Sequence, residues 1–282
     1  MPGLIDLCLG DCLRNSPLSA TCFLPDAYKE KNMQRFQNKV AIVTGASSGL
    51  GAAVARQLVA EGATVLGIAR NLERLEEVAA STADHVGEMH CFVADQSDPA
   101  QCEGAIEQAV QQFSQLDILI NNAGAHVLRH TTDVSPQQWQ EDLGTNLSGP
   151  FYFCRYALPY LLKAAGNIVN VSSLAGQQGQ PYSAGYCAAK HGVIGLTRAL
   201  ALEYTHEDIR INAVCPGGMM TPQIENFSAP DGVDFDLVLR SAAPRGMMEA
   251  EQVAETIAYV ASAQASALHG AIIMADNGKT VG

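Results

Sequence analysis

Two residues that could share a proton-transfer task lie four positions apart, at Tyr186 and Lys190. On a helix, residues i and i+4 lie on one face, so both side chains would point the same way. A free tyrosine has a pKa of about 10 and is a poor base at neutral pH. A neighbouring ammonium group favours the phenolate and lowers the pKa of the phenol. Alone, however, such a pair more often lies on the exposed face of an amphipathic helix.

A glycine-rich turn with the sequence TGASSGLG runs from Thr44 to Gly51, after an apolar run and before a helical one. Glycines let the backbone approach a pyrophosphate, and the helix N-terminus offers free N–H groups and the positive end of the helix dipole. The Gly-x-x-x-Gly-x-Gly spacing differs from the Gly-x-Gly-x-x-Gly of long-chain dehydrogenases. The turn therefore predicts a dinucleotide site of a different pattern.

From Lys39 onward, short apolar runs alternate with longer helical ones. The runs lack a two-residue alternation, which is typical of strands buried on both faces. The expected strands are Val40–Thr44, Thr64–Ala69, Met89–Ala94, Leu116–Asn121, Asn167–Val171, Ile209–Val214 and Gly270–Met274. The expected helices are Leu50–Glu61, Leu72–Ala83, Pro99–Phe113, Pro136–Ala165, Ala184–Tyr204 and Ala250–Ala261. This pattern predicts one α/β domain with a single Rossmann-like, doubly wound parallel sheet of about seven strands and helices on both faces.

Further polar and glycine residues follow the expected strands in a definite order. They are Asp95 after the third strand, Asn121-Asn122-Ala123-Gly124 after the fourth, Asn146 in the long helix, Ser173 after the fifth strand and Pro216-Gly217 after the sixth. Ser173 lies thirteen residues before Tyr186. Together with the glycine turn and the Tyr186–Lys190 pair, this ordered set resembles the short-chain dehydrogenase/reductase family in its form of roughly 250 residues. The resemblance covers residues 39–282.

The resemblance implies a catalytic set. Tyr186 would be the general acid that protonates a carbonyl oxygen during reduction and the base in the reverse direction. Ser173 would hold and polarise the same oxygen. Lys190 would also bind the nicotinamide ribose, and Asn146 would support a water-linked proton relay.

The resemblance also implies a cofactor-binding set. It comprises Gly45, Ser47, Ser48, Gly49, Leu50, Gly51, Arg70, Asp95, Asn121, Ala123, Gly124, Tyr186, Lys190, Pro216, Gly217 and Thr221. Asp95 would hydrogen-bond the adenine, although Asp-x-Ser-Asp-Pro is also a good helix-start sequence. Asn121 would line the cofactor groove. Pro216 and Gly217 would begin the loop that wraps the nicotinamide, with Thr221 near its amide or phosphates.

The residues at the end of the second expected strand indicate whether the coenzyme is NADP or NAD. Relatives that prefer NAD usually place an acid there to bind the ribose hydroxyls, whereas this chain has Ala69 followed by Arg70. A guanidinium group can form a bidentate, charge-assisted pair with a 2′-phosphate. The alternative is that Arg70 only solvates a helix start, and Ser48 stands where some NADP-dependent relatives carry a second basic residue. We expect NADP(H) in preference to NAD.

The resulting hypothesis is an NADP(H)-dependent oxidoreductase that interconverts a carbonyl and a secondary alcohol on a small molecule. A 3-oxoacyl-thioester reductase of fatty-acid synthesis is the alternative, with Arg129 and Arg155 as a local basic patch for an acidic carrier protein. A polyol or sugar reductase is a third option. A non-catalytic NADP(H) sensor on the same fold is a fourth, disfavoured because Tyr186 and Lys190 are both present.

Three segments are expected to select the substrate: Ala125–His130, Leu174–Ser183 and Gly218–Met248. No strand is expected in the segment Gly218–Met248, and we expect it to form a lid. Its methionines and aromatics could form an adaptable apolar pocket or anchor the lid to the body; they are Met219, Met220, Phe227, Phe235, Met247 and Met248. His126 is a candidate for substrate contact.

Composition narrows the partners and the compartment. The 282-residue chain has a formal net charge of −12, which disfavours binding to nucleic acid or to anionic membranes. Its eight cysteines form no Cys-x-x-Cys pair and no matching histidine spacing, a pattern typical of reduced thiols in the cytoplasm without a metal site. The family resemblance implies a homotetramer or homodimer that pairs through the helices of residues 136–165 and 184–204.

Residues 1–35 have no net charge and lack the pattern of a secretory signal. We expect a non-catalytic leader or an extension upstream of a start at Met33, followed by a catalytic domain over 36–282. An oligomer arm or a redox tag using Cys8, Cys12 and Cys22 is the alternative.

Overall fold

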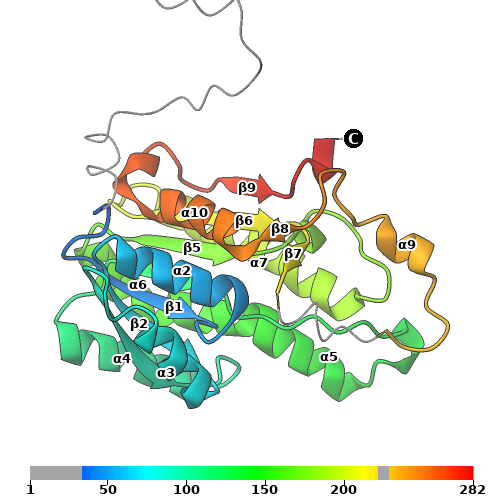
Figure 1. Ribbon diagram of the computed structural model, residues 1–282, viewed down its shortest axis with the longest axis horizontal. Coiled ribbons are helices and arrows are strands. Elements are labelled where there is room, and N and C mark those ends of the chain that lie inside the picture. The colour runs from blue at the N-terminus through cyan, green and yellow to red at the C-terminus, as the bar shows by residue number, and fades with distance from the viewer. Residues whose placement is uncertain (1–33, 222–228, 282) are drawn as a thin grey trace, which may run out of the picture. The chain divides into compact units, whose positions relative to one another are not determined.

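The computed structural model describes residues 34–221 and 229–281. In this part of the chain, strands and helices alternate as expected (Figure 1). The strands of the main sheet are β1 (Val40–Thr44), β2 (Thr64–Ala69), β3 (Glu88–Val93), β4 (Ile118–Asn121), β5 (Asn167–Val171), β6 (Arg210–Pro216) and β9 (Ile272–Ala275). The helices are α2 (Gly49–Ala60), α3 (Leu72–Ala80), α4 (Pro99–Phe113), α5 (Pro136–Leu143), α6 (Gly149–Lys163), α7 (Ala184–Glu203), α9 (Phe235–Leu239) and α10 (Ala250–Ala261).

The main sheet has seven parallel strands in the order β3-β2-β1-β4-β5-β6-β9. The chain builds outward from β1 to β3 and then crosses to the other side of β1 to form β4. This reversal creates a crevice at the carboxyl ends of β1 and β4, where open α/β sheets bind their ligands. The predicted doubly wound fold is confirmed.

Helices cover both faces of this sheet. On β1, Ala41 and Val43 belong to the core cluster that contains α2 and α10. Val40 and Ile42 belong to the opposite cluster, which contains α4 and α6. Because successive side chains of a strand point to opposite faces, a strand covered on both sides must be apolar throughout. Figure 1 shows α10 running alongside α2 on one face.

Local sequence signals start the helices. Asp98 caps α4, where its carboxylate accepts the N–H of Ala100 at 2.9 Å, and Pro99 occupies the first helical position. Asn71 caps α3 through the N–H of Arg74. These caps fix the start of each helix close to the carboxyl end of the preceding strand.

The helix expected over 136–165 is present, as an uninterrupted helical segment over residues 136–163, but it contains an irregularity that we did not expect. A π-helical stretch over Gly144–Ser148 lies between α5 and α6. Asn146 lies in that stretch, fully buried, and its side-chain amide exchanges hydrogen bonds with the backbone of Ala125 at 2.9 and 3.0 Å. Such insertions leave backbone groups outside the regular ladder, and hydrophobic periodicity does not reveal them.

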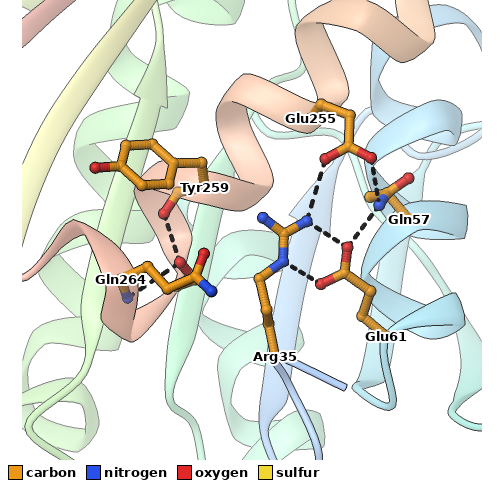
Figure 2. A network of polar contacts seen from close by, with 7 residues as sticks. Arg35, Gln57, Glu61, Glu255, Tyr259 and Gln264 are labelled. Carbon is orange, nitrogen blue, oxygen red and sulfur yellow. Dashed lines mark hydrogen bonds and ion pairs between the residues drawn. The ribbon is translucent and has the colours of Figure 1, made fainter. Parts of the chain in front are cut away.

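The first residues that the structure describes contact the folded part of the chain. Figure 2 shows Arg35 between Glu61, at the end of α2, and Glu255 of α10. Arg35 pairs with Glu61 and reaches Glu255 at 3.2 Å, and Gln57 hydrogen-bonds both glutamates. Phe36 is 1% exposed. Arg35, which we expected in the leader, therefore belongs to the folded domain. Residues 1–33 of the expected leader, with Cys8, Cys12 and Cys22, lie outside the described residues.

The segment 218–248 contains more regular structure than expected. Two short strands, β7 (Met219–Met220) and β8 (Met248–Glu249), form a parallel pair, and α9 lies between them in the chain. Met248 is buried and Met219 packs against the same core, so these two methionines anchor the segment. Met220, Phe235 and Met247 are exposed. Phe227 lies outside the described residues.

Candidate active site

A cavity of about 340 Å³ lies at the crevice between β1 and β4. It is lined by most of the residues that the sequence singled out. These are Gly45, Ser47, Ser48, Gly49, Leu50, Gly51, Arg70, Asp95, Ala123, Gly124, Ser173, Tyr186, Lys190, Pro216, Gly217 and Thr221. The structure thus brings together residues that span almost two hundred positions of the chain. Asn121 and Asn146 are the expected site residues that do not line it.

The glycine turn forms one wall of this cavity. Gly45 has φ +69° and Gly49 has φ +51°, conformations that other residues rarely adopt. A Cβ at Gly51 would lie 2.1 Å from the carbonyl oxygen of Gly45, so only glycine allows α2 to approach the turn. Ser48, the N-cap of α2, makes no side-chain hydrogen bond to the helix. The N–H groups of the first helical turn therefore face the cavity without a side-chain cap, an arrangement that suits a pyrophosphate.

Ser173, Tyr186 and Lys190 lie together at another part of the same cavity. Ser173 follows β5, while Tyr186 and Lys190 lie in the first turns of α7. The Lys190 ammonium is 5.7 Å from the centroid of the Tyr186 ring, and it donates a hydrogen bond to the Val171 carbonyl at 2.9 Å. The Ser173 hydroxyl accepts the N–H of Ala175 at 3.1 Å, which fixes its position at the start of a 3₁₀ turn.

Burial acts on both titratable groups of this cluster. It raises the pKa of the Tyr186 phenol, although hydrogen bonding from Ser173 opposes that effect. It also lowers the pKa of Lys190 to about 8, because an ammonium ion loses solvation in the interior. Lys190 therefore remains mostly protonated at pH 7 and places a positive charge beside the phenol.

Asn146 lies behind the cavity wall. Its Nδ2 donates to the carbonyls of Ala125 and Asp142, and its Oδ1 accepts the N–H of Ala125. Both N–H bonds of the amide and one acceptor position of its oxygen are therefore taken by backbone groups, and these contacts fix the loop that follows β4. A Cβ at Gly124 would lie 2.8 Å from Asn146 Oδ1, which explains the glycine at that position.

The expectation that the Asn121 side chain lines the cofactor groove is wrong. Asn121 is 2% exposed, and its Nδ2 donates to Asn170 Oδ1 at 2.8 Å, in the core between β5 and α6. The next residue, Asn122, lines the cavity instead. Neighbouring residues at a strand end point to opposite faces, so a shift of one position exchanges the two roles.

Asp95 and Asp98 divide the two roles that the sequence left open. Asp98 is the helix cap, whereas Asp95 lines the cavity and accepts both the N–H and the hydroxyl of Ser97. Partial burial alone would raise the pKa of Asp95, but the Ser97 hydrogen bonds and the charge of Arg70 bring it below its usual range. The Arg70 guanidinium lies 3.8 Å from the Asp95 carboxylate, and its side chain is 77% exposed.

Sequence analysis missed several residues that shape this cavity. The Thr44 hydroxyl accepts the N–H groups of Asn122 and Ala123 at 3.0 and 2.9 Å and so ties β1 to the loop after β4. Gln96 donates to the carbonyls of Ala123 and Thr145. Both lie directly beside residues of the predicted set, at the carboxyl ends of β1 and β3. That position is the signal that could have identified them.

The expected substrate segments meet beside the catalytic cluster. The His130 ring contacts the carbonyl of Asp231 at 2.9 Å, and the Tyr182 hydroxyl accepts the N–H of Asp234 at 2.9 Å. The His126 ring stacks on Tyr186 with centroids 4.3 Å apart. Residues 229–234 are thus held by the two loops that precede α5 and α7.

A site of this kind, with a glycine cradle for a dinucleotide at one end and a Ser-Tyr-Lys cluster at the other, is that of a nicotinamide-dependent oxidoreductase. The model of the short chain dehydrogenase family matches residues 39–231. The chain belongs to the short-chain dehydrogenase/reductase family. It is accordingly an oxidoreductase that acts on CH–OH donors with NAD(P)+ as acceptor.

Individual relatives agree with this assignment. The meso-2,3-butanediol dehydrogenase of Serratia marcescens is 37% identical over 246 residues, covering 87% of this chain and 96% of the relative. The 3-oxoacyl-(acyl-carrier-protein) reductase of Thermotoga maritima is 33% identical over 249 residues, covering 88% and 100%. The crystal structure of a short chain dehydrogenase from Mycobacterium paratuberculosis bound to NAD has a TM-score of 0.81 at 27% identity, covering 88% of this chain and all of that one.

Among residues 34–221 and 229–281, no helix is both long and apolar enough to span a membrane.

Proposed function

We propose that this chain is an NADP(H)-dependent oxidoreductase that interconverts a carbonyl group and a secondary alcohol, with Tyr186 as general acid and base. One observation carries the proposal: Ser173, Tyr186 and Lys190 line the same cavity as the glycine turn of Gly45–Gly51. A substrate oxygen held by two hydroxyl groups would then lie within reach of a bound nicotinamide.

The nicotinamide, when bound, supplies a hydride to the carbonyl carbon or accepts one from the alcohol carbon. During reduction, the Tyr186 hydroxyl gives its proton to the carbonyl oxygen, and in the oxidative direction the phenolate takes that proton back. Ser173 donates a hydrogen bond to the same oxygen as negative charge develops on it. The positive charge of Lys190 counteracts the effect of burial on the phenol and favours its ionised form.

The structure fits the cofactor at both ends. The glycine turn lines the cavity beside the N-terminus of α2, where a pyrophosphate would bind, and Lys190 has donors beyond the one used by Val171 to hold ribose hydroxyls. Pro216, Gly217 and Thr221 would hold the nicotinamide. The cofactor-binding roles of the remaining lining residues stay as predicted from the sequence, with Asn122 in place of the Asn121 side chain.

Arg70 supports NADP(H) over NAD. Ala69, at the end of β2, provides no carboxylate for the ribose hydroxyls, and the exposed Arg70 guanidinium lines the cavity directly after it. The 3.8 Å distance between the Arg70 guanidinium and the Asp95 carboxylate is long for an ion pair. The guanidinium could therefore bind a phosphate in place of Asp95. A bidentate contact of this kind contributes about 1.5–3 kcal/mol.

Kinetics with both coenzymes test this choice. Arg70→Ala should raise the KM for NADPH by about tenfold or more and leave the KM for NADH nearly unchanged. Arg74→Ala, an exposed arginine one turn into α3, is the matched control and should change neither value. Equal KM values for the two coenzymes in the unaltered protein would contradict the proposal.

A small ketone or secondary alcohol is the substrate class that we favour, in line with the meso-2,3-butanediol dehydrogenase among the relatives. The 3-oxoacyl-thioester reductase remains the second candidate because a relative of that activity is 33% identical. It is less well supported by the surface, since Arg129 pairs with Asp142 at 3.0 Å and is engaged within the fold. Assays with ketones, 3-keto thioesters, steroids and sugars distinguish these classes.

We further propose that residues 218–248 act as the substrate lid of a catalytic domain that begins near residue 34, after a non-catalytic leader. A homodimer or homotetramer through α6 and α7 is supported by a shallow apolar depression there, lined by Leu147, Phe151 and Leu196 among others. The five cysteines of the described residues are free thiols, which suits a cytoplasmic location.

A further inference from the structure

The ring of His126 lies face to face with the ring of Tyr186. The two centroids are 4.3 Å apart and the planes differ by 24°. His126 comes from the loop after β4, two residues beyond Gly124, whereas Tyr186 comes from α7. The stacking therefore joins the loop after β4 to α7 at the catalytic cluster.

A chain of hydrogen bonds fixes the His126 ring. The Ser183 hydroxyl donates its proton to the Pro181 carbonyl at 3.0 Å, so its oxygen is left to accept the Nε2–H of His126 at 2.8 Å. The imidazole is thereby assigned as the Nε2–H tautomer. Beside it, the N–H of Arg129 donates to the Tyr182 carbonyl at 2.8 Å. The loop that carries His126 is thus tied to the segment that leads into α7.

The stacked imidazole is neutral at physiological pH. Burial, together with the charge of Lys190, lowers the pKa of His126 to about 4. The titratable groups that face Tyr186 are Lys190 and Cys187 from α7, Cys215 from β6 and His126 from the loop. Among them only Lys190 is charged at pH 7, so His126 acts on the phenol through contact and not through charge.

We propose that His126 is a positioning residue for Tyr186, whose ring it holds in one plane so that the phenol O–H bond keeps one direction beside Ser173. This inference rests on the proposed function of Tyr186. The phenol oxygen lies on the axis about which the ring turns, but the O–H bond prefers the plane of the ring. A ring free to turn would therefore spend part of its time with the O–H bond misdirected, and proton transfer needs hydrogen-bond geometry. The consequence belongs to the catalytic step and not to coenzyme binding.

Steady-state kinetics provide the first test. His126→Ala should lower kcat by about tenfold with an unchanged KM for NADPH. His126→Phe keeps a ring on the phenol but cannot make the hydrogen bond to Ser183, so it should restore most of kcat. If His126→Ala fails to bind NADPH, His126→Leu, which refills the volume without a ring, takes its place with the same expected loss. His85→Ala, on the exposed surface, is the matched control.

Fluorine NMR provides a second test that needs no turnover. With 3,5-difluorotyrosine incorporated at position 186, a ring held in one plane gives two separate fluorine resonances, because its two edges have different surroundings. The unaltered protein and His126→Phe should give two resonances. His126→Ala or His126→Leu should give one, because the ring then flips rapidly.

The two readouts separate failure of the inference from failure of the proposed function. Two resonances in His126→Ala, or a Phe variant as impaired as the Ala variant, would overturn the inference even where the enzyme is active. An unaltered protein without turnover on any carbonyl class would overturn the proposed function, while the resonances would still decide whether His126 holds the ring.

Discussion

Lys190 is 3% exposed, and its hydrogen bond goes to a backbone carbonyl and not to a carboxylate. Burial therefore lowers its pKa to about 8 without an anion to compensate. A cation kept in such surroundings is costly for folding, and enzymes accept this cost where the charge is needed for chemistry. At the scale of single residues, the site trades stability for a positive charge beside the phenol.

Replacing this cation should separate stability from activity. We expect Lys190→Met to abolish turnover while leaving the free energy of unfolding at pH 7 unchanged or higher, because the desolvated charge is removed. Urea unfolding and NADPH-linked turnover measure the two effects. A variant that loses turnover only because it unfolds would contradict this account of Lys190.

The stability of the protein should depend on pH through His126. Its pKa is about 4 in the folded chain and about 6.5 in an unfolded one, so only the unfolded chain binds the proton between these values. Above pH 6.5 the ring is neutral in both states and does not change the free energy of unfolding. As the pH falls from 6.5 toward 4, the free energy of unfolding decreases, by about 3 kcal/mol at most.

Unfolding free energies at pH 7 and pH 4.5 measure this dependence. The unaltered protein should lose more stability between the two values than His126→Phe, which has no group to protonate. Parallel losses in the two proteins would show that His126 does not carry the effect.

The meeting of Ser173, Tyr186 and Lys190 at one cavity was predictable because their spacing is a local property of the chain. Tyr186 and Lys190 share one helix face, and Ser173 follows a strand that any parallel sheet directs to the same edge. Asn121 was misplaced because two asparagines end the same strand, and only the register of β4 decides which one faces the cavity.

At the scale of elements, close contacts between helices and turns hold the site. The approach of α2 to the turn before it depends on Gly51, where a Cβ would collide with the Gly45 carbonyl. The other end of α2 is tied to α10 through Arg35, Glu61 and Glu255, as Figure 2 shows. Both contacts set the position of the helix whose N-terminus faces the cavity.

Gly51→Ala should weaken NADPH binding at least about tenfold, because α2 must move away from the turn. Gly104→Ala is the matched control, since a Cβ there meets nothing closer than 4.0 Å in the middle of α4. The control should bind NADPH normally and be slightly more stable, since alanine favours helices over glycine. Titration of coenzyme fluorescence compares the two. Equal affinities would contradict the role of Gly51.

Arg35→Ala should lower the free energy of unfolding by about 3 kcal/mol, because it leaves the Glu61 carboxylate, with a side chain only 7% exposed, without its cation. Arg74→Ala, on the surface of α3, should have an effect within about 0.5 kcal/mol. Urea denaturation of the two variants checks this. A loss of unfolding free energy no larger than that of the control would show that Arg35 does not stabilise the folded domain.

Elements were less predictable from the sequence than residues. The strands and helices follow from apolar runs and caps, but the π-helical stretch around Asn146, inside the helix expected over 136–165, does not. The apolar periodicity is continuous there, and Asn146 makes its hydrogen bonds to Ala125, in a different element. Tertiary contacts of this kind leave no local pattern. The same holds for the pairing of β7 with β8, two residues each.

At the scale of the whole molecule, the surface of this acidic chain carries an apolar patch. Phe151 is 42% exposed on α6, beside Leu147 and Leu196, although the chain carries a net charge of −12. Exposed apolar clusters on helices are typical of surfaces that a partner covers. This is why we propose that copies of the chain pair through α6 and α7.

Phe151→Arg should convert the oligomer to smaller species, because the guanidinium would be buried without a partner. Light scattering at micromolar concentration measures the mass. Phe235→Arg, on the exposed surface of α9, is the matched control and should leave the mass unchanged. A monomeric mass for the unaltered protein would contradict the assembly.

The central claim is that Tyr186 transfers the proton in an NADP(H)-linked interconversion of a carbonyl and an alcohol. The most direct measurement is the loss of NADPH absorbance with a panel of carbonyl substrates, for the unaltered protein and for Tyr186→Phe. Tyr160→Phe, which lies at a separate surface cavity, is the control. We expect kcat to fall by about 10²–10⁴-fold in Tyr186→Phe, with NADPH binding retained and the control fully active. Equal turnover in the unaltered protein and in Tyr186→Phe would contradict the claim.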